Sequence, residues 1–251
     1  MKIPIKFHTL SQTKLKFFAS LQSKKIREKE ALFLIEGKKL VEEALSECIE
    51  IKALIVTNQE IIKELDIHPA LDCYLAKPEE FKKISSLENP EGILAVASCF
   101  KKRELSIQHN HKYFILDQIQ DPGNLGTILR ICDAFDIQGV ILHQCVEIYN
   151  PKVVRASMGA IFRVPFYEMV DIQTFIEKNH HKMIKSDLQG KSLKDIQLTD
   201  FQFIVLGNEA NGLISEWTQK IKHSLCIPQK GKAESLNVAV AGAILAWEWT
   251  K

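Results

Sequence analysis

The chain has 251 residues, of which 46% are hydrophobic and 25% are charged, and its formal net charge is +2. These values fit one large globular domain or two modest ones, and they exclude a disordered or fibrous chain. The stretch from Met1 to Leu21 lacks the apolar core of a signal peptide, and no apolar run is long enough to span a bilayer. We therefore expect a cytoplasmic protein with no membrane partner.

The charge is concentrated at the N-terminus. Ten bases and three acids lie between Met1 and Leu40, a net +7, so the rest of the chain carries −5. A concentrated basic face suits contacts to phosphate groups, although a solvated helix surface explains it equally well.

The alternation of helical and strand patterns predicts a small α/β domain over residues 1–100. A polar linker follows at 101–112, because apolar periodicity stops there. The elements expected in the first domain are a lysine-rich helix before Lys25, strand 31–35, helix 38–45, strand 53–57, helix 59–65, strand 73–76, helix 78–84 and strand 92–97.

The second predicted domain spans residues 113–251. Its short, nearly all-apolar strands between helices indicate a parallel sheet covered on both faces. The expected elements are strand 113–116, a turn at Asp121-Pro122-Gly123, a helix from about Asn124 to Phe135, strand 139–143, strands near 182–185, 203–206 and 225–227, and a final helix from about 235 to 249.

Three polar, glycine-containing segments fall at strand ends or helix starts of this domain, where open α/β sheets bind ligands. The first, 121–130, offers Asn124 as a candidate N-cap and places Arg130 beside the apolar stripe of its helix. The second, 150–160, begins like a helix with Pro151 at its first position. The third is split between 206–212 and 227–237, where exposed N–H groups could hold a carboxylate or an adenine edge.

Each segment alone also has a purely structural explanation: a helix cap with a snorkelling arginine, helix-on-sheet packing, and a simple Ser235 N-cap. The dinucleotide and P-loop signatures are missing, as is the hydrolase G-x-S-x-G elbow. The six cysteines form no C-x-x-C pair and no histidine has metal-ligand spacing, so we expect reduced core thiols and no metal.

Together the three segments resemble the motifs of the SpoU (TrmH) family of RNA 2′-O-ribose methyltransferases, in the family's order and spacing. Residues 121–130 resemble motif one, Arg155-Ala156-Ser157-x-Gly159-Ala160 resembles motif two, and Gly207-x-Glu209-x-x-Gly212 with Ile227-Pro228 and 235–238 resembles motif three. More loosely, 33–37 and 91–96 resemble the substrate-binding domain that precedes many members, a ribosomal-protein-type RNA binder.

The resemblance implies a trefoil-knotted SPOUT methyltransferase domain with a parallel sheet, S-adenosylmethionine as cofactor, structured RNA (rRNA, less readily tRNA) as substrate, and a homodimer. It implies catalytic roles for Arg130, Asn124, Glu209, Ser235 and Asn237. It implies cofactor binding by Gly207, Gly212, Ile227, Pro228 and Leu236. The RNA-binding candidates are Lys24, Lys25, Arg27 and Arg155.

Two other functions stay open at this stage: a non-catalytic RNA-binding or ribosome-assembly factor that retains the fold, and a relative that methylates a base. The full set of motif residues argues against the first, and the motif-one arginine with Ser235-Leu236-Asn237 favours ribose over base. The final helix carries Leu236, Val240, Ile244 and Trp247 at helical spacing, which indicates either intrachain core or a dimer interface.

Overall fold

The computed structural model describes residues 5–102, 104–169, 171–208 and 212–251. The chain divides into two compact units, each made of two stretches. The first unit is Met1–Lys101 with Glu147–Phe162, and the second is Lys102–Val146 with Arg163–Lys251. The two units are described separately below.

The first unit is built on a five-stranded mixed sheet in the order β1-β4-β3-β5-β2. Strands β1, β4 and β3 are parallel to one another, whereas β5 pairs antiparallel with both β3 and β2. The strands are β1 (Phe7–Thr9), β2 (Leu32–Glu36), β3 (Ile51–Val56), β4 (Asp72–Leu75) and β5 (Ile93–Ser98).

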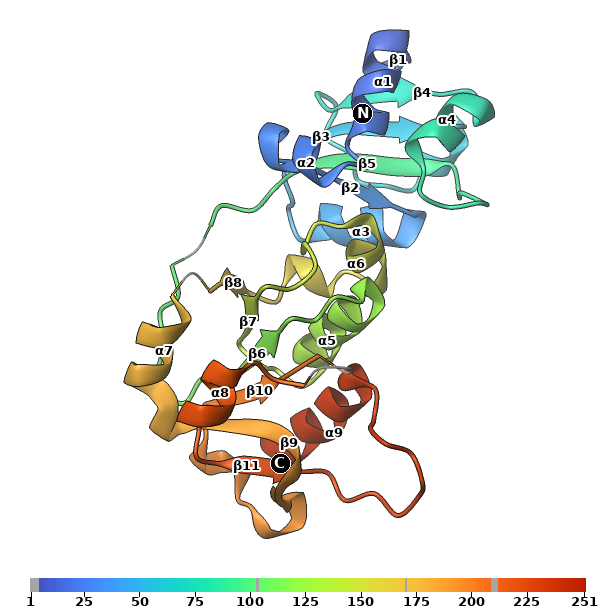
Figure 1. Cartoon of the computed structure of the whole chain (residues 1–251). Coiled ribbons are helices and arrows are strands. Elements are labelled where there is room, and N and C mark those ends of the chain that lie inside the picture. The colour runs from blue at the N-terminus through green and yellow to red at the C-terminus, as the bar shows by residue number, and fades with distance from the viewer. Residues whose placement is uncertain (1–4, 103, 170, 209–211) are drawn as a thin grey trace. The chain divides into compact units, whose positions relative to one another are not determined.

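Helices α1 (Gln12–Ser20), α2 (Lys24–Glu30), α3 (Lys38–Ser46) and α4 (Pro78–Ile84) surround this sheet, with a 3-10 turn η1 at Gln59–Ile62 (Figure 1). Ser11 caps α1 by accepting a hydrogen bond from the amide of Lys14. Leu15 and Phe18 of α1 are buried with Phe81 of α4 in the core of this unit.

The second unit is built on a six-stranded sheet in the order β11-β9-β10-β6-β7-β8, and every pairing is parallel. Such a sheet is covered on both faces, which explains the nearly all-apolar strands. They are β6 (Tyr113–Asp117), β7 (Gly139–His143), β8 (Phe166–Glu168), β9 (Met183–Ser192), β10 (Phe203–Leu206) and β11 (Ser224–Cys226).

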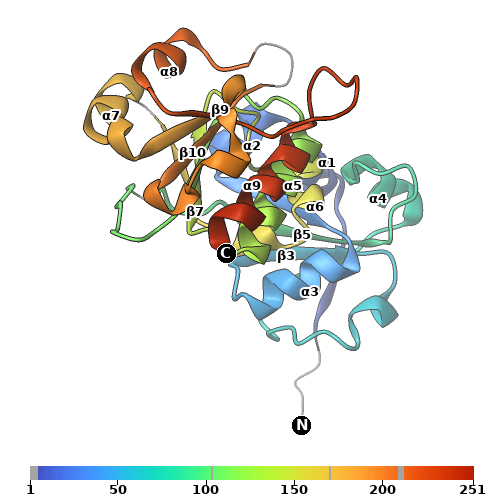
Figure 2. The ribbon, with the colours of Figure 1, turned by 90° about the horizontal axis from the view of Figure 1, so that it is seen from below.

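The helices of the second unit are α5 (Pro122–Ala134), α7 (Ile172–Asn179), α8 (Ser215–Lys220) and α9 (Val238–Thr250), with 3-10 turns at His180–Lys182, Leu193–Asp195 and Leu198–Asp200. Helix α9 packs along α5, as Figure 2 shows. Trp249 fixes the end of α9, since its indole N–H donates to the carbonyl of Phe201 at 3.1 Å.

The segment 147–162 contains helix α6 (Pro151–Ala156) and a 3-10 turn at Ala160–Phe162, and it packs within the first unit. Helix α6 contacts β2, and the ring of Tyr149 lies 4.9 Å from that of Phe33. Residues 147–162 of the expected domain 113–251 therefore belong to the first unit, and the boundaries of that domain stay a prediction. Part of the expected linker is packed as well, because Leu105 and Ile107 contact the core of the second unit.

Every strand of four residues or more was expected at its position, although β9 (Met183–Ser192) runs seven residues beyond the strand expected near 182–185. The strands that were not expected, β1 and β8, have three residues each, too short to show periodicity. The helix expected at 59–65 is only the 3-10 turn at 59–62. No helix of the described residues is long and apolar enough to cross a membrane.

Candidate active site

The motif segments of the second unit leave the same edge of its sheet. Motif one follows the carboxyl end of β6, the segment beginning at Gly207 follows β10, and the segment beginning at Ile227 follows β11. Because the strands are parallel, their carboxyl ends lie at one edge, the usual ligand-binding edge of open α/β sheets. The fold thus brings motifs one and three to one region (Figure 1).

Two asparagines join motif one to motif three directly. The side-chain amide of Asn237 donates to the Asn124 carbonyl oxygen at 2.9 Å. Asn124 is not the N-cap of its helix, as the sequence had suggested: Asp121 is, and it accepts from the Asn124 amide at 2.8 Å. The side chain of Asn124 therefore does not cap its helix and instead contacts Asn237.

The start of the final helix also differs from the expectation. Asn237, and not Ser235, is the N-cap of α9, and its side-chain oxygen accepts from Ala239 and Val240. Ser235 is exposed and lies before the helix. Its hydroxyl has no capping task, which leaves it available to a ligand.

Gly207 and Gly212 lie against each other. A Cβ at Gly207 would come within 2.7 Å of the Gly212 backbone, so no larger residue fits there without a shift. Gly212 has a φ of +68°, a conformation that favours glycine. Asn208 and Gly212 exchange two backbone hydrogen bonds of 3.1 and 2.9 Å. Glu209, the expected catalytic carboxylate between them, lies outside the described residues.

The segment 227–236 presents apolar side chains and open backbone. Ile227 and Leu236 are half-buried, whereas Pro228 is exposed. Residues 228–236 make no backbone hydrogen bond with any other residue that the structure describes. Apolar contacts for an adenine ring and unused N–H and C=O groups for its edge are what an S-adenosylmethionine site requires, so these residues fit that cofactor.

Arg130 is exposed on α5 and forms no hydrogen bond or ion pair with another described residue. A guanidinium group stays protonated in proteins, so this exposed arginine is a permanent positive charge with five hydrogen-bond donors. That arrangement suits a phosphate or a developing oxyanion.

The expected RNA-binding residues separate into two kinds. Lys24 and Lys25 are exposed, as a phosphate contact requires. Arg27 is only 2% exposed. Its guanidinium forms an ion pair with Glu147 and donates 2.8 Å hydrogen bonds to the carbonyls of Leu21 and Gln22. The interpretation of Arg27 as an RNA contact is wrong, because its donors are used inside the first unit.

Arg155 of motif two is also held within the first unit. It donates to the hydroxyl of Ser86 and lies 3.7 Å from the buried carboxylate of Glu36. The small residues beside it serve packing: Ser157 is fully buried, and a Cβ on Gly159 would lie 3.2 Å from Glu43 of α3. The structural explanation of motif two as a packing surface therefore holds for these residues.

Sequence reasoning missed a buried pair beneath the site. Asp117 and His143 end β6 and β7, and the His143 Nδ1 lies 2.7 Å from an Asp117 carboxylate oxygen. The available signal was a titratable residue closing each apolar strand. Nearby, burial raises the pKa of the Cys145 thiol to about 11, so this cysteine is protonated at neutral pH.

The cysteines are all free, but Cys48 is exposed, so the expectation of core thiols is wrong for that residue. Within the described residues, no group of histidine, cysteine and carboxylate side chains could hold a metal ion.

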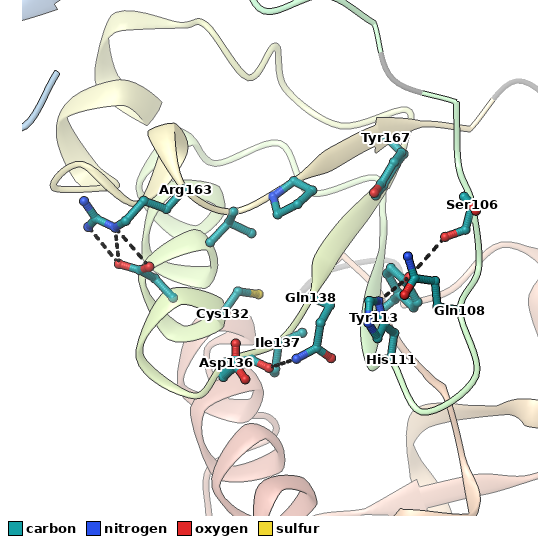
Figure 3. Close-up of a pocket in the computed structure, with 13 residues that line it drawn as sticks. Ser106, Gln108, His111, Tyr113, Cys132, Asp136, Ile137, Gln138, Arg163 and Tyr167 are labelled. Atoms are coloured by element: carbon teal, nitrogen blue, oxygen red, sulfur yellow. Dashed lines mark hydrogen bonds and ion pairs between the residues drawn. The ribbon is translucent and has the colours of Figure 1, made fainter. Parts of the chain in front are cut away.

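A separate pocket of about 480 Å³ lies at the opposite, amino edge of the second sheet (Figure 3). Tyr113, Gln138 and Tyr167, at or beside the starts of three strands, line it. Arg163 lines it too but is paired with Asp133 at 2.8 Å. This pocket contains no motif residue and does not belong to the site described above.

The architecture agrees with that of solved methyltransferases. The structure of an AdoMet-bound rRNA methyltransferase from Sinorhizobium meliloti has a TM-score of 0.82 and 28% identity, covering 98% of this chain and 97% of that one. A structure of the TrmH family from Porphyromonas gingivalis has a TM-score of 0.84 and 33% identity, over 96% and 98% of the two chains. The parallel sheet and the motifs at its carboxyl edge thus define a methyltransferase of the SPOUT class.

The match extends to the family. Residues 111–247 match the model of the SpoU rRNA Methylase family, and residues 12–95 match the MRM3-like substrate binding domain. The chain is 33% identical over 239 residues to 23S rRNA (guanosine(2553)-2'-O)-methyltransferase RlmP of Bacillus subtilis (strain 168), with 93% of this chain and 94% of that protein covered. The chain belongs to the SpoU rRNA methylase family, which confirms the expected resemblance.

Proposed function

We propose that this enzyme transfers a methyl group from S-adenosylmethionine to a ribose 2′-hydroxyl of ribosomal RNA. The observation that carries the proposal is the Asn124–Asn237 contact, which joins motifs one and three beside exposed Arg130 at the carboxyl edge of the second sheet. The B. subtilis relative, by its name, methylates a guanosine 2′-O position of 23S rRNA, and this supports ribose over base as the acceptor. We also propose the cytoplasm, the location expected from the sequence.

In this reaction the ribose O2′ forms a bond to the methyl carbon, the carbon–sulfur bond breaks, and the hydroxyl proton leaves to solvent or a nearby base. Bound S-adenosylmethionine would supply the electrophilic methyl group. The residues proposed to hold it are Gly207, Gly212, Ile227, Pro228 and Leu236.

The proposed role of Arg130 is electrostatic. Because guanidinium is essentially always protonated, Arg130 is better suited to hold a phosphate and stabilise the developing alkoxide than to accept the proton. The ribose or the arginine would be oriented by Asn124, Ser235 and Asn237. Holding the reactants in the right orientation removes a large part of the activation free energy of such transfers. Glu209 is proposed for the same site from the motif alone.

We infer a homodimer from the outer face of α9. Val240, Ile244 and Trp247 are 49%, 36% and 59% exposed, whereas Val238, Leu245 and Trp249 on the opposite side are buried. The intrachain-core explanation of this stripe is therefore wrong for these three residues. An exposed apolar stripe of this kind marks an interaction surface. We also propose the trefoil knot, which the family resemblance implies.

Exposed Lys24 and Lys25 support a role for the first unit in RNA affinity. The match of residues 12–95 to a substrate binding domain supports the same role.

The proposed function is tested by mapping ribose methylation across the ribosomal RNA of a deletion strain. One nucleotide should lose its 2′-O-methyl group and regain it with the wild-type gene, but not with the Arg130→Ala gene. If the full pattern of ribose methylation persists in the deletion strain, the proposed substrate is wrong.

A further inference from the structure

Asp117 is a buried carboxylate at the end of a central strand of the second sheet. It is the last residue of β6, it lies between β10 and β7, and it is 0% exposed. Both of its oxygens are used: one lies 2.7 Å from His143 Nδ1, and the other accepts a 3.0 Å hydrogen bond from the backbone amide of Ile214. A buried carboxylate is retained only where such partners compensate its desolvation.

His143 lies directly opposite Asp117 in the strand register and is itself only 6% exposed. Its ring and that of Trp217 of α8 form a T-shaped pair, with ring centroids 6.2 Å apart. The imidazole is thus held between the carboxylate and an indole, and its hydrogen bond fixes the direction of the Asp117 side chain.

The contact to Ile214 places Asp117 next to the proposed cofactor residues. Asn208 directly follows Gly207, and Ile214 lies two residues after Gly212. The Asn208 side-chain amide donates to the carbonyl of Gln118 at 3.0 Å, and the Ile214 amide donates to Asp117. The successive residues Asp117 and Gln118 therefore hold the loop on both sides, after Gly207 and after Gly212.

We propose that Asp117 is a positioning residue for the cofactor site, and that His143 orients its carboxylate for this task. The inference rests on the proposed binding of S-adenosylmethionine at Gly207 and Gly212. In the free enzyme the Asp117–Ile214 hydrogen bond fixes the chain after Gly212, so that the backbone groups of the site are already arranged when the cofactor arrives. Such preorganisation lowers the ordering cost of binding.

The alternative is that the pair only stabilises the fold. Removing a buried acceptor costs stability in either case, because the Ile214 N–H and the imidazole are left without partners. The two roles predict different cofactor affinities for the molecules that remain folded. Their affinity falls if the pair positions the loop, and it stays unchanged if the pair only stabilises the fold.

The experiment compares Asp117→Ala with Asp117→Asn in the full-length protein, and includes His143→Ala. The asparagine keeps a carbonyl oxygen for the Ile214 amide, whereas the alanine does not. Asp133→Ala is the matched control, since it removes a paired carboxylate of the same unit at the opposite edge of the sheet. The measurements are S-adenosylmethionine affinity by calorimetry with its stoichiometry, hydrogen exchange at the Ile214 amide, and steady-state kinetics.

We expect Asp117→Ala to weaken cofactor binding by about tenfold or more and to lose exchange protection at Ile214, with kcat at saturating cofactor within about threefold of wild type. Asp117→Asn should stay within about threefold in affinity, and Asp133→Ala should match wild type. His143→Ala should fall between the two Asp117 variants.

The inference is overturned if Asp117→Ala binds the cofactor as wild type does with unchanged exchange at Ile214. Where Asp117→Ala does not fold, the same result for His143→Ala overturns it. Wild-type protein that binds no S-adenosylmethionine would instead contradict the proposed function, so the two failures are distinguishable.

Discussion

Arg27 in the first unit and Arg130 in the second both lie on helices, but their environments differ. Arg27 is 2% exposed and paired with a carboxylate of its own unit, while Arg130 is exposed on α5 with no partner among the described residues. Arg155 resembles Arg27, since it is held by Glu36 and Ser86. Charge alone therefore does not identify a functional arginine; the charge has to be free to meet a ligand.

The same contrast applies to the two sheets. Polar groups of the first unit, such as Glu36 with Ser85 and Ser86, are satisfied inside that unit. In the second unit, by contrast, Ser235 and Arg130 at the carboxyl edge of the sheet are left to solvent. We propose that the first unit supplies an RNA-binding surface and that the second unit supplies the chemistry.

The largest expected effect is on folding. Arg27→Ala should lower the free energy of unfolding by about 3 to 5 kcal/mol, because it leaves the Glu147 carboxylate without its buried partner. Lys25→Ala, an exposed neighbour, should change it by less than about 0.5 kcal/mol. Urea unfolding of both variants measures the difference, and equal stabilities would show that burial does not separate these two cations.

The second effect is on catalysis. Arg130→Ala should reduce methyl transfer by about 10²- to 10³-fold, the loss seen when one electrostatic donor to a developing oxyanion is removed. Cofactor affinity should stay close to wild type, because Arg130 is assigned to the RNA side of the site. Tritiated-methyl transfer and calorimetry give the two values, with Arg163→Ala at the opposite edge as the matched control. Substantial turnover by Arg130→Ala would rule out its catalytic assignment.

The third effect is on assembly. The double variant Ile244→Glu, Trp247→Glu should be a monomer, because two charges then stand on the exposed apolar face of α9. Leu188→Glu, on an exposed leucine of β9, should leave the dimer intact. Sedimentation velocity at micromolar concentration distinguishes the two, and a wild-type monomer would refute the dimer itself.

The smallest effect is on RNA affinity. Charge reversal at Lys24 and Lys25 should weaken RNA binding and flatten the slope of log affinity against log salt, by roughly 0.7 to 0.9 for each phosphate group that the protein no longer neutralises. Lys52→Glu, in the first unit but outside the basic stretch Met1–Leu40, serves as the control. Unchanged affinity and slope would mean that the basic N-terminus is only a solvated surface. Point variants are preferred to truncation, because residues 147–162 pack within the first unit.

Local patterns in the sequence predicted the longer strands and most of the helices of both units, because apolar periodicity is a property of neighbouring residues, but they missed the three-residue strands β1 and β8. Motif order likewise predicted which segments carry the chemistry. The burial of Arg27 could not be predicted, since its partner Glu147 is 120 positions away. The Asp117–His143 pair depends in the same way on the register of two strands 26 residues apart.

The helix N-caps also could not be predicted to the residue from the sequence, although they depend on residues close together in the chain. Asp121 and Asn237 act as N-caps where Asn124 and Ser235 had been expected. Each of the four residues is of a type that caps helices well, so the choice depends on where the helix starts, which is set by packing against the sheet.

The central claim is that the protein methylates a ribose 2′-hydroxyl, and its most direct test is to locate the transferred methyl group in the RNA. Unmodified ribosomal RNA incubated with the wild-type protein and methyl-labelled S-adenosylmethionine is hydrolysed in alkali, which cleaves after every ribose except a 2′-O-methylated one. Ribose methylation by this protein predicts the label in alkali-resistant dinucleotides, and its loss with Arg130→Ala. Label recovered in mononucleotides would show base methylation, and the absence of label would show that the chain does not methylate this RNA; either result contradicts the account.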